Sequence, residues 1–116
     1  MKKKILCFDL DGVICKTIKR NYLKAKPNKK VIKLINQLYY DYKIKIYTSR
    51  YMGRNNDNVK LAKKQGYKST FRQLKNWGLN FHELKLGKIS YDLIIDDKAL
   101  GFKKNWHKDI QKILKK

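Results

Sequence analysis

Two short apolar runs in the sequence each end in a pair of aspartates, Asp9 with Asp11 and Asp96 with Asp97. Such runs are typical of strands buried in a parallel sheet, whose carboxyl ends lie at one edge. Four carboxylates at one edge repel one another unless a divalent cation neutralises them, and an all-oxygen site suits Mg²⁺. The pairs therefore predict a magnesium site, the alternative being solvated turn or cap acids.

The elements that must position these aspartates alternate along the chain. We predict strands over 5–10, 43–48, 81–86 and 91–96 from short apolar or alternating runs. We predict helices from their start signals and from apolar residues spaced by three and four: 28–42, a short basic helix over 58–64, a helix from Ser69 or Thr70 to Gly78, and 109–114. Residues 12–26 and 53–58 are predicted loops, the first with room for a short hairpin.

Strands that alternate with helices predict an α/β fold, in which a central parallel sheet carries helices on both faces. Ligands of such folds bind at the carboxyl ends of the strands, which is where the aspartates fall. A chain of 116 residues has the length of one domain, so we expect residues 1–116 to form a single unit.

The composition is strongly basic, with 30 Lys and Arg against 9 Asp and Glu and a net charge of +21. A field of this sign attracts phosphates, nucleic acids and anionic membranes. However, 26 of the 30 cations are Lys and only 4 are Arg, the residue that recognises phosphates and bases in bidentate fashion. Lys, Ile, Asn and Tyr together make 55 residues, so either AT-rich codon drift or a selected anion-attracting surface explains the charge.

The two cysteines indicate reduced thiols, because Cys7 and Cys15 form neither a CxxC pair nor a zinc-like cluster with the histidines. The basic start followed by four apolar residues imitates a signal peptide, but Asp9 and Asp11 interrupt it. No run approaches the 18 or more apolar residues of a membrane span. We therefore expect a soluble, cytoplasmic protein with no membrane span.

Four segments resemble, in order, the motifs of the haloacid dehalogenase superfamily. Residues 4–13 contain the DxDG motif after an apolar strand, 44–50 resemble the strand that ends in Thr or Ser, 87–88 fit the lysine motif, and 96–97 fit the final acidic pair. The stretch 87–99 is similar to small capless phosphatases of capsule and lipopolysaccharide biosynthesis, and more distantly to the 3′-phosphatase domain of polynucleotide kinases. The resemblance implies a Rossmann-like three-layer core.

The resemblance also implies roles for the reacting groups. Asp9 would be the nucleophile that forms an aspartyl-phosphate, and Asp11 would protonate the leaving group and then activate water. Lys88 would neutralise Asp9 and the phosphoryl group, with Lys85 as a nearby alternative.

Substrate and metal binding follow from the same resemblance. Thr48 would hold a phosphate oxygen, Ser49 shares that stretch, and Arg50 would clamp a second anionic group or form a surface salt bridge. The Mg²⁺ ligands would be side chains or backbone at the acidic motifs, with the last residue acting directly or through water: Asp9, Asp11, Asp96 and Asp97.

The intervals that carry a cap domain in many relatives are too short for one here, which predicts an open cleft. An open cleft suits a large substrate, or a small one enclosed by a partner subunit of a homo-oligomer. The first hypothesis is a magnesium-dependent phosphatase acting on a sugar phosphate or a similar small precursor of a surface polysaccharide. The alternatives are a nucleic-acid 3′-end phosphatase and a catalytically silent binding module.

Overall fold

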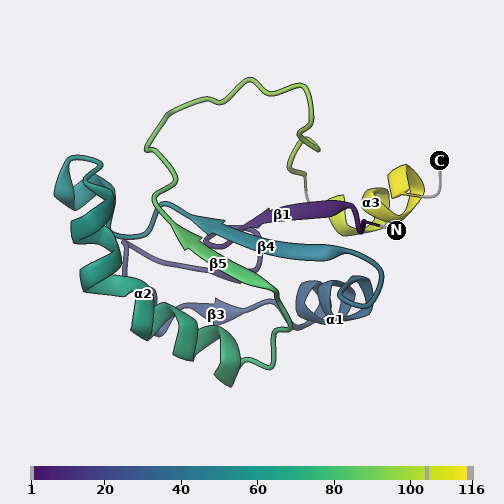
Figure 1. Cartoon of the computed structure of the whole chain (residues 1–116), viewed down its shortest axis with the longest axis horizontal. Helices are drawn as coiled ribbons and strands as arrows, with labels where there is room; N and C mark the ends of the chain where they lie inside the picture. The colour runs from purple at the N-terminus through teal and green to yellow at the C-terminus, as the bar shows by residue number, and fades with distance from the viewer. Residues whose placement is uncertain (1, 104, 115–116) are drawn as a thin grey trace.

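A three-stranded parallel sheet organises the chain in the computed structural model, which describes residues 2–103 and 105–114 (Figure 1). The strands are β1 (Ile5–Asp9), β4 (Lys43–Thr48) and β5 (Glu83–Leu86), in the order β1-β4-β5. The register pairs Asp9 with Tyr47 and Thr48 with Leu86, so the three carboxyl ends lie at one edge. The predicted parallel sheet is confirmed for these three strands.

Helices flank the sheet, and short elements connect them. The main helices are α1 (Lys29–Leu38), α2 (Val59–Asn76) and α3 (Trp106–Leu114). The connections contain the antiparallel pair β2 (Cys15–Lys16) and β3 (Lys26–Pro27) and the 3-10 turns η1 (Tyr22–Lys24) and η2 (Gly53–Asn55). As predicted, Asn28 caps α1, because its side chain accepts a hydrogen bond from the backbone N–H of Val31. None of the helices in the described residues is long and apolar enough to cross a membrane.

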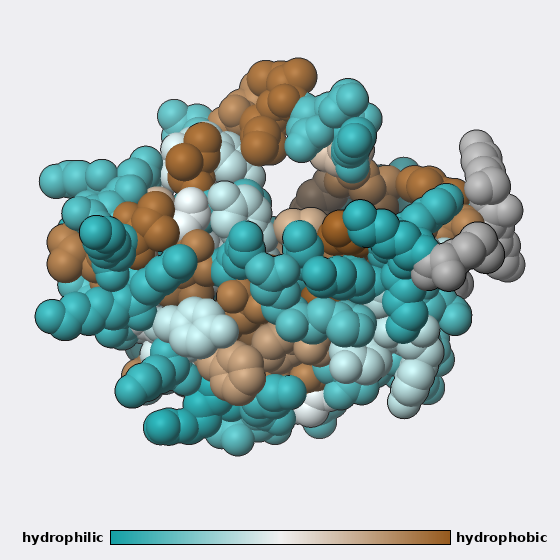
Figure 2. All heavy atoms as spheres, viewed as in Figure 1, coloured by the Kyte–Doolittle hydropathy of each residue, from teal (hydrophilic) through white to brown (hydrophobic). Residues whose placement is uncertain are grey.

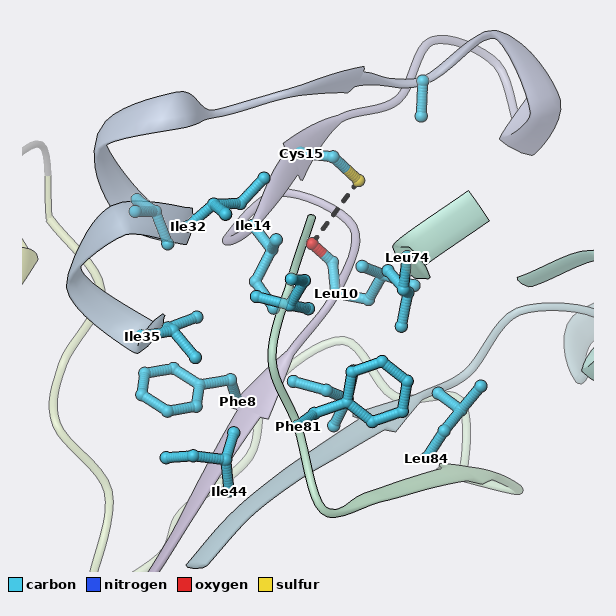
Figure 3. Close-up of a cluster of buried hydrophobic side chains, with 14 of the residues drawn as sticks. Phe8, Leu10, Ile14, Cys15, Ile32, Ile35, Ile44, Leu74, Phe81 and Leu84 are labelled. Atoms are coloured by element: carbon cyan, nitrogen blue, oxygen red, sulfur yellow. Dashed lines mark hydrogen bonds between the residues drawn. The ribbon is translucent and has the colours of Figure 1, made fainter. Parts of the chain in front are cut away.

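The core lies on one face of the sheet (Figure 3). Side chains alternate along a strand, so Ile44 and Ile46 point into the core. Leu74 of α2 and Ile35 of α1 pack against this face (Figure 3). Helix α3 lies beside β1, where Trp106 packs on Phe8 with 6.0 Å between ring centroids. That contact lies ahead of the predicted helix start at Asp109, which explains why α3 begins earlier.

The opposite face of the sheet is polar. Glu83 lies between Lys45 and Lys85, with N–O distances of 3.7 and 3.5 Å, and all three side chains are partly exposed. Helices on both faces were predicted, but in the part of the chain that the structure describes this face carries charged side chains instead. The alternation of charged and apolar residues in β4 and β5 is the physical reason, since it suits a sheet with one buried face.

Helix α2 is one continuous helix, and the two separate helices predicted over 58–64 and 69–78 are wrong. The predicted break lies around Gly66, in a polar stretch without apolar periodicity. The helix continues there because the missing Cβ makes room for the ring of Tyr51, whose carbons would lie 2.2 Å from a Cβ at this position. Glycine is unfavourable inside a helix, so packing has overridden local propensity here.

The strand predicted over 91–96 is not formed. Residues 87–103 leave the end of β5 and arch away from the sheet before α3 (Figure 1), and Figure 2 shows apolar side chains along this arch. Leu93 and Ile95 are 77% and 88% exposed. An apolar run forms a strand only where a neighbouring strand supplies its hydrogen bonds, and the run itself does not specify that neighbour.

Candidate active site

Asp9 is the last residue of β1 and lies at the carboxyl edge of the sheet. Its Oδ1 accepts a hydrogen bond of 2.8 Å from the backbone N–H of Leu10, which fixes the carboxylate. Its Oδ2 lies 3.4 Å from the Nζ of Lys88, and the Asp9 side chain is 36% exposed. Asp9 thus presents one anchored oxygen and one oxygen that faces a cation.

Lys88 follows the end of β5 and approaches Asp9 from across the sheet. Its backbone N–H donates to the carbonyl of Thr48 at 3.2 Å, which ties the residue to the end of β4. Burial alone lowers the pKa of Lys88, but a hydrogen bond with Tyr91 and the Asp9 carboxylate raise it above its ordinary value. Lys85, the predicted alternative, pairs with Glu83 on the polar face, so Lys88 is the lysine that lies beside Asp9.

Thr48 and Ser49 end the central strand between these two residues. The Thr48 side chain is buried, and its Oγ1 accepts a 3.1 Å hydrogen bond from the backbone N–H of Arg50. Its hydroxyl proton remains available to a further acceptor. Ser49 is exposed at the same edge. The ends of three neighbouring strands therefore place Asp9, Thr48 and Lys88 at one edge of the sheet, where the side chains of Asp9 and Lys88 are in contact.

Asp11 and Arg50 form an ion pair in which the Arg50 side chain is buried. Of the two roles expected for Arg50, the clamp on an anionic substrate group is corrected, and the ion pair is present but does not lie at the surface. The Arg50 side chain is 1% exposed, and its Nε and Nη2 donate to the Asp11 carboxylate at 2.9–3.1 Å. Its Nη1 donates to the Oε1 of Gln73 at 2.7 Å. Each guanidinium nitrogen thus has a partner within the protein, so Arg50 offers no free group to a ligand.

Two further residues surround Asp11. The Thr17 hydroxyl donates to Asp11 Oδ1, and the Cys15 thiol lies 3.5 Å from the same oxygen. Burial raises the pKa of Cys15 to about 11, which keeps the thiol protonated and able to donate. No motif in the sequence marks Cys15, Thr17 or Gln73, because they meet Asp11 and Arg50 only through the β2–β3 turn and one face of α2.

Asp96 and Asp97 do not join Asp9 in this structure. Both are exposed in the arch of residues 87–103, where Asp96 Oδ1 accepts a hydrogen bond from the backbone N–H of Lys98. Across residues 2–103 and 105–114, no three His, Cys, Asp or Glu side chains lie close enough to hold a metal ion. As these side chains lie, the predicted donor set does not fit magnesium.

Among the described residues, no inserted cap domain lies beside Asp9. Between Asp11 and α1 the chain forms only the β2–β3 pair and one 3-10 turn. A groove of about 690 Å³ lies elsewhere, between α1 and the end of α2, and its lining includes Asn36 and Trp77 but none of the predicted site residues.

Comparison with known proteins gives information about the fold alone. No protein family and no curated protein matches the chain. Its structure is similar to the crystal structure of an MCSG target from Vibrio cholerae, with a TM-score of 0.78 and 22% sequence identity. The match covers 95% of this chain and 98% of that chain. At this identity the likeness concerns the fold and carries no activity.

Proposed function

We propose that the chain is a phosphatase of the haloacid dehalogenase type that hydrolyses a phosphomonoester through an aspartyl-phosphate. One observation supports this best: the partly exposed carboxylate of Asp9 at the end of β1, with its Oδ2 3.4 Å from Lys88 Nζ. Nucleophile, counter-charge and the Thr48 hydroxyl lie at the ends of adjacent parallel strands, where ligands of such sheets bind. The substrate we propose is a small phosphorylated sugar or similar surface-polysaccharide precursor.

In the first step Asp9 Oδ2 attacks phosphorus, so that a new P–O bond forms as the bond to the leaving alkoxide breaks. Lys88 neutralises the negative charge on the phosphoryl oxygens. Phosphoryl transfer is accelerated mainly by positioning and by electrostatic stabilisation of this charge. Asp11 gives its proton to the alkoxide. In the second step Asp11 takes a proton from water, the water oxygen bonds to phosphorus, and Asp9 is released with inorganic phosphate.

Magnesium dependence is part of the proposal but needs a rearrangement of residues 91–97. Two properties of the chain support such a movement. The outer edge of β1 has no partner strand among the described residues, and Leu93, Ile94 and Ile95 are exposed to solvent. Unpaired strand edges and contiguous exposed apolar side chains are both unfavourable in a free protein.

A phosphate-release screen tests the proposal. The purified protein, with Mg²⁺, is offered hexose phosphates, nucleotides and 3′- or 5′-phosphorylated oligonucleotides. We expect turnover that Asp9→Asn abolishes with little change in melting temperature, because the two side chains have nearly the same shape. Asp57→Asn is a matched control, since Asp57 is exposed and hydrogen bonds to Ser90. Turnover that survives Asp9→Asn would overturn the nucleophile assignment.

The second candidate is a nucleic-acid 3′-end phosphatase, favoured by the net charge of +21 and the uncapped site. Turnover of oligonucleotides far above that of sugar phosphates would favour it. A protein that cannot hydrolyse even an activated aryl phosphate would instead be the catalytically silent binding module.

The proposal also includes a cytoplasmic location and a homo-oligomer. Both cysteines are free thiols, which fits the reducing cytoplasm. If the substrate is small, a second subunit could enclose the open site, and light scattering would detect such a homo-oligomer.

A further inference from the structure

Arg50 is the largest fully buried side chain among the described residues, and it is charged. Its Nε contacts both carboxylate oxygens of Asp11, and Nη2 contacts Oδ1. Such a bidentate pair is short, strong and geometrically specific. Burial of a guanidinium is costly, so the pair is retained only where its geometry compensates.

A set of neighbours holds Arg50 in this orientation. Its guanidinium carbon lies 4.9 Å from the centre of the Tyr22 ring, and Gln73 joins the two residues by accepting from Arg50 Nη1 and donating to the Tyr22 carbonyl at 2.7 Å. The next residue, Tyr51, adopts a left-handed backbone with φ of 67°. This conformation is strained for a bulky residue, and the space above Gly66 accommodates its ring.

The two oxygens of Asp11 are consequently not equivalent. Oδ1 accepts from Arg50 Nη2 and Nε, from the Thr17 hydroxyl and from the Cys15 thiol. Among the described residues, Oδ2 receives only the 2.9 Å bond from Arg50 Nε. The Asp11 side chain is 26% exposed, so its less occupied oxygen has room for a further proton.

We propose that Arg50 is a positioning residue that anchors Asp11 through Oδ1 and leaves Oδ2 to carry the proton exchanged with the leaving group and with water. The inference rests on the proposed phosphatase activity. Arg50 acts on the reaction through Asp11 and does not contact the substrate. The proton moves from Asp11 Oδ2 to the alkoxide in the first step and returns from water in the second.

The leaving group provides the test. Departure of p-nitrophenolate needs no proton, whereas departure of an alkoxide does. For Arg50→Lys we expect the single-turnover rate of leaving-group release to fall by about 30-fold or more with an alkyl phosphate and by less than about 3-fold with p-nitrophenyl phosphate. Hydrolysis of the aspartyl-phosphate, in which Asp11 activates water, should slow by the same factor with both substrates. In an Asp11→Asn background, Arg50→Lys should cause no further loss, because the group it positions has gone.

The matched control is Arg54→Lys, since exposed Arg54 stacks on Tyr51 and Tyr22. It should leave both substrates at wild-type rates. If Arg50→Lys loses its near-ultraviolet circular dichroism, Gln73→Met serves instead. It removes the acceptor of Nη1 and the donor to the Tyr22 carbonyl but keeps both partners of the ion pair, and it should show the same leaving-group difference at smaller size.

Equal losses with both substrates in the single-turnover rate of leaving-group release, or losses that multiply with Asp11→Asn, would mean that Arg50 only stabilises the fold, and would overturn this inference alone. Turnover that survives Asp9→Asn would overturn the proposed function. The two failures are therefore distinguishable in one set of variants.

Discussion

At the scale of single residues, Lys88 keeps its positive charge over the pH range in which the site would be assayed. The raised pKa of Lys88 means that the folded protein holds this proton more tightly than the unfolded chain. The stabilisation is fully present below pH 10.5, the ordinary value for lysine, and is lost as pH rises through the folded pKa. Lys88 therefore stays charged wherever the proposed reaction would be assayed.

Lys88→Gln should lower kcat with p-nitrophenyl phosphate by about 100-fold, because Asp9 and the phosphoryl group lose their counter-charge. In the wild type, no loss of activity between pH 7 and 10 should trace to this lysine. The measurement is kcat from pH 6 to 10 for the wild type, Lys88→Gln and Lys85→Gln. A larger loss in Lys85→Gln than in Lys88→Gln would contradict the assignment of Lys88.

Sequence reasoning predicted where the candidate site residues that end strands lie, and missed the residues that pack behind them. Asp9, Thr48 and Lys88 follow apolar runs, and parallel strands bring such positions to one edge. Arg50 was a candidate with two expected roles, an anion clamp or a surface salt bridge, and the sequence did not reveal its partners Asp11 and Gln73, which lie 39 and 23 positions away. No local pattern specifies a contact that depends on how a hairpin and a helix pack.

At the scale of elements, His82 links the entry of β5 to the start of β4. Its Nδ1 accepts a 2.9 Å hydrogen bond from the backbone N–H of Ile44, while its own backbone N–H donates to the Ile44 carbonyl. The ring stacks on Tyr39 at 4.2 Å. Partial desolvation, with contributions from Lys3 and Lys43, lowers the pKa of His82. Protonation would convert this acceptor to a donor and break the bond to Ile44.

The free energy of unfolding should therefore fall as pH drops below 6.5, because the unfolded chain binds this proton first. His82→Phe keeps a ring against Tyr39 but removes the acceptor, so it should be less stable at pH 7.5 and should lose this contribution to the pH dependence. Urea denaturation at pH 7.5 and 5.5 measures both effects, with His107→Phe as the control. If the free energy of unfolding of His82→Phe fell between pH 7.5 and 5.5 by as much as that of the wild type, the prediction would be contradicted.

Elements with a local signal were predictable, and elements that depend on distant partners were not. The Asn28 cap and apolar spacing specify α1, and the alternating pattern specifies β4. The continuity of α2 depends on Tyr51 packing over Gly66. Residues 91–96 can form a strand only if they pair with the edge of another strand. The apolar run predicted a strand there but did not specify a neighbouring strand to pair with.

Adding Mg²⁺ directly tests whether residues 91–97 move toward Asp9. If metal binding draws Asp96 and Asp97 toward Asp9, amide exchange in residues 91–97 should slow by about 10-fold or more in saturating Mg²⁺, since ligands couple local ordering to binding. Asp96→Asn should abolish the protection, whereas Asp92→Asn, in the same exposed segment, should keep it. Exchange that Mg²⁺ leaves unchanged would contradict magnesium as a cofactor of this site.

At the scale of the whole molecule, the net charge of +21 is compatible with either a small or a polymeric phosphate, and the two differ in their response to salt. A single-stranded nucleic acid releases counterions on binding, so its affinity falls with a slope of about −0.7 per phosphate contacted on a log-log plot. Contact with about five phosphates would thus cost about 100-fold between 50 and 200 mM salt. A hexose phosphate carries one phosphate, and only screening weakens its binding.

We expect the weak salt dependence of a small phosphate substrate. KM for a hexose phosphate should rise by less than about 5-fold from 50 to 200 mM KCl, and a 3′-phosphorylated decanucleotide should not be turned over faster at either concentration. The two substrates must be compared at equal Mg²⁺ and pH, so that only monovalent salt changes. A decanucleotide with the higher kcat/KM at 50 mM and a loss near 100-fold at 200 mM would show that the basic surface binds a polymer, and the nucleic-acid end phosphatase would then replace the sugar phosphatase.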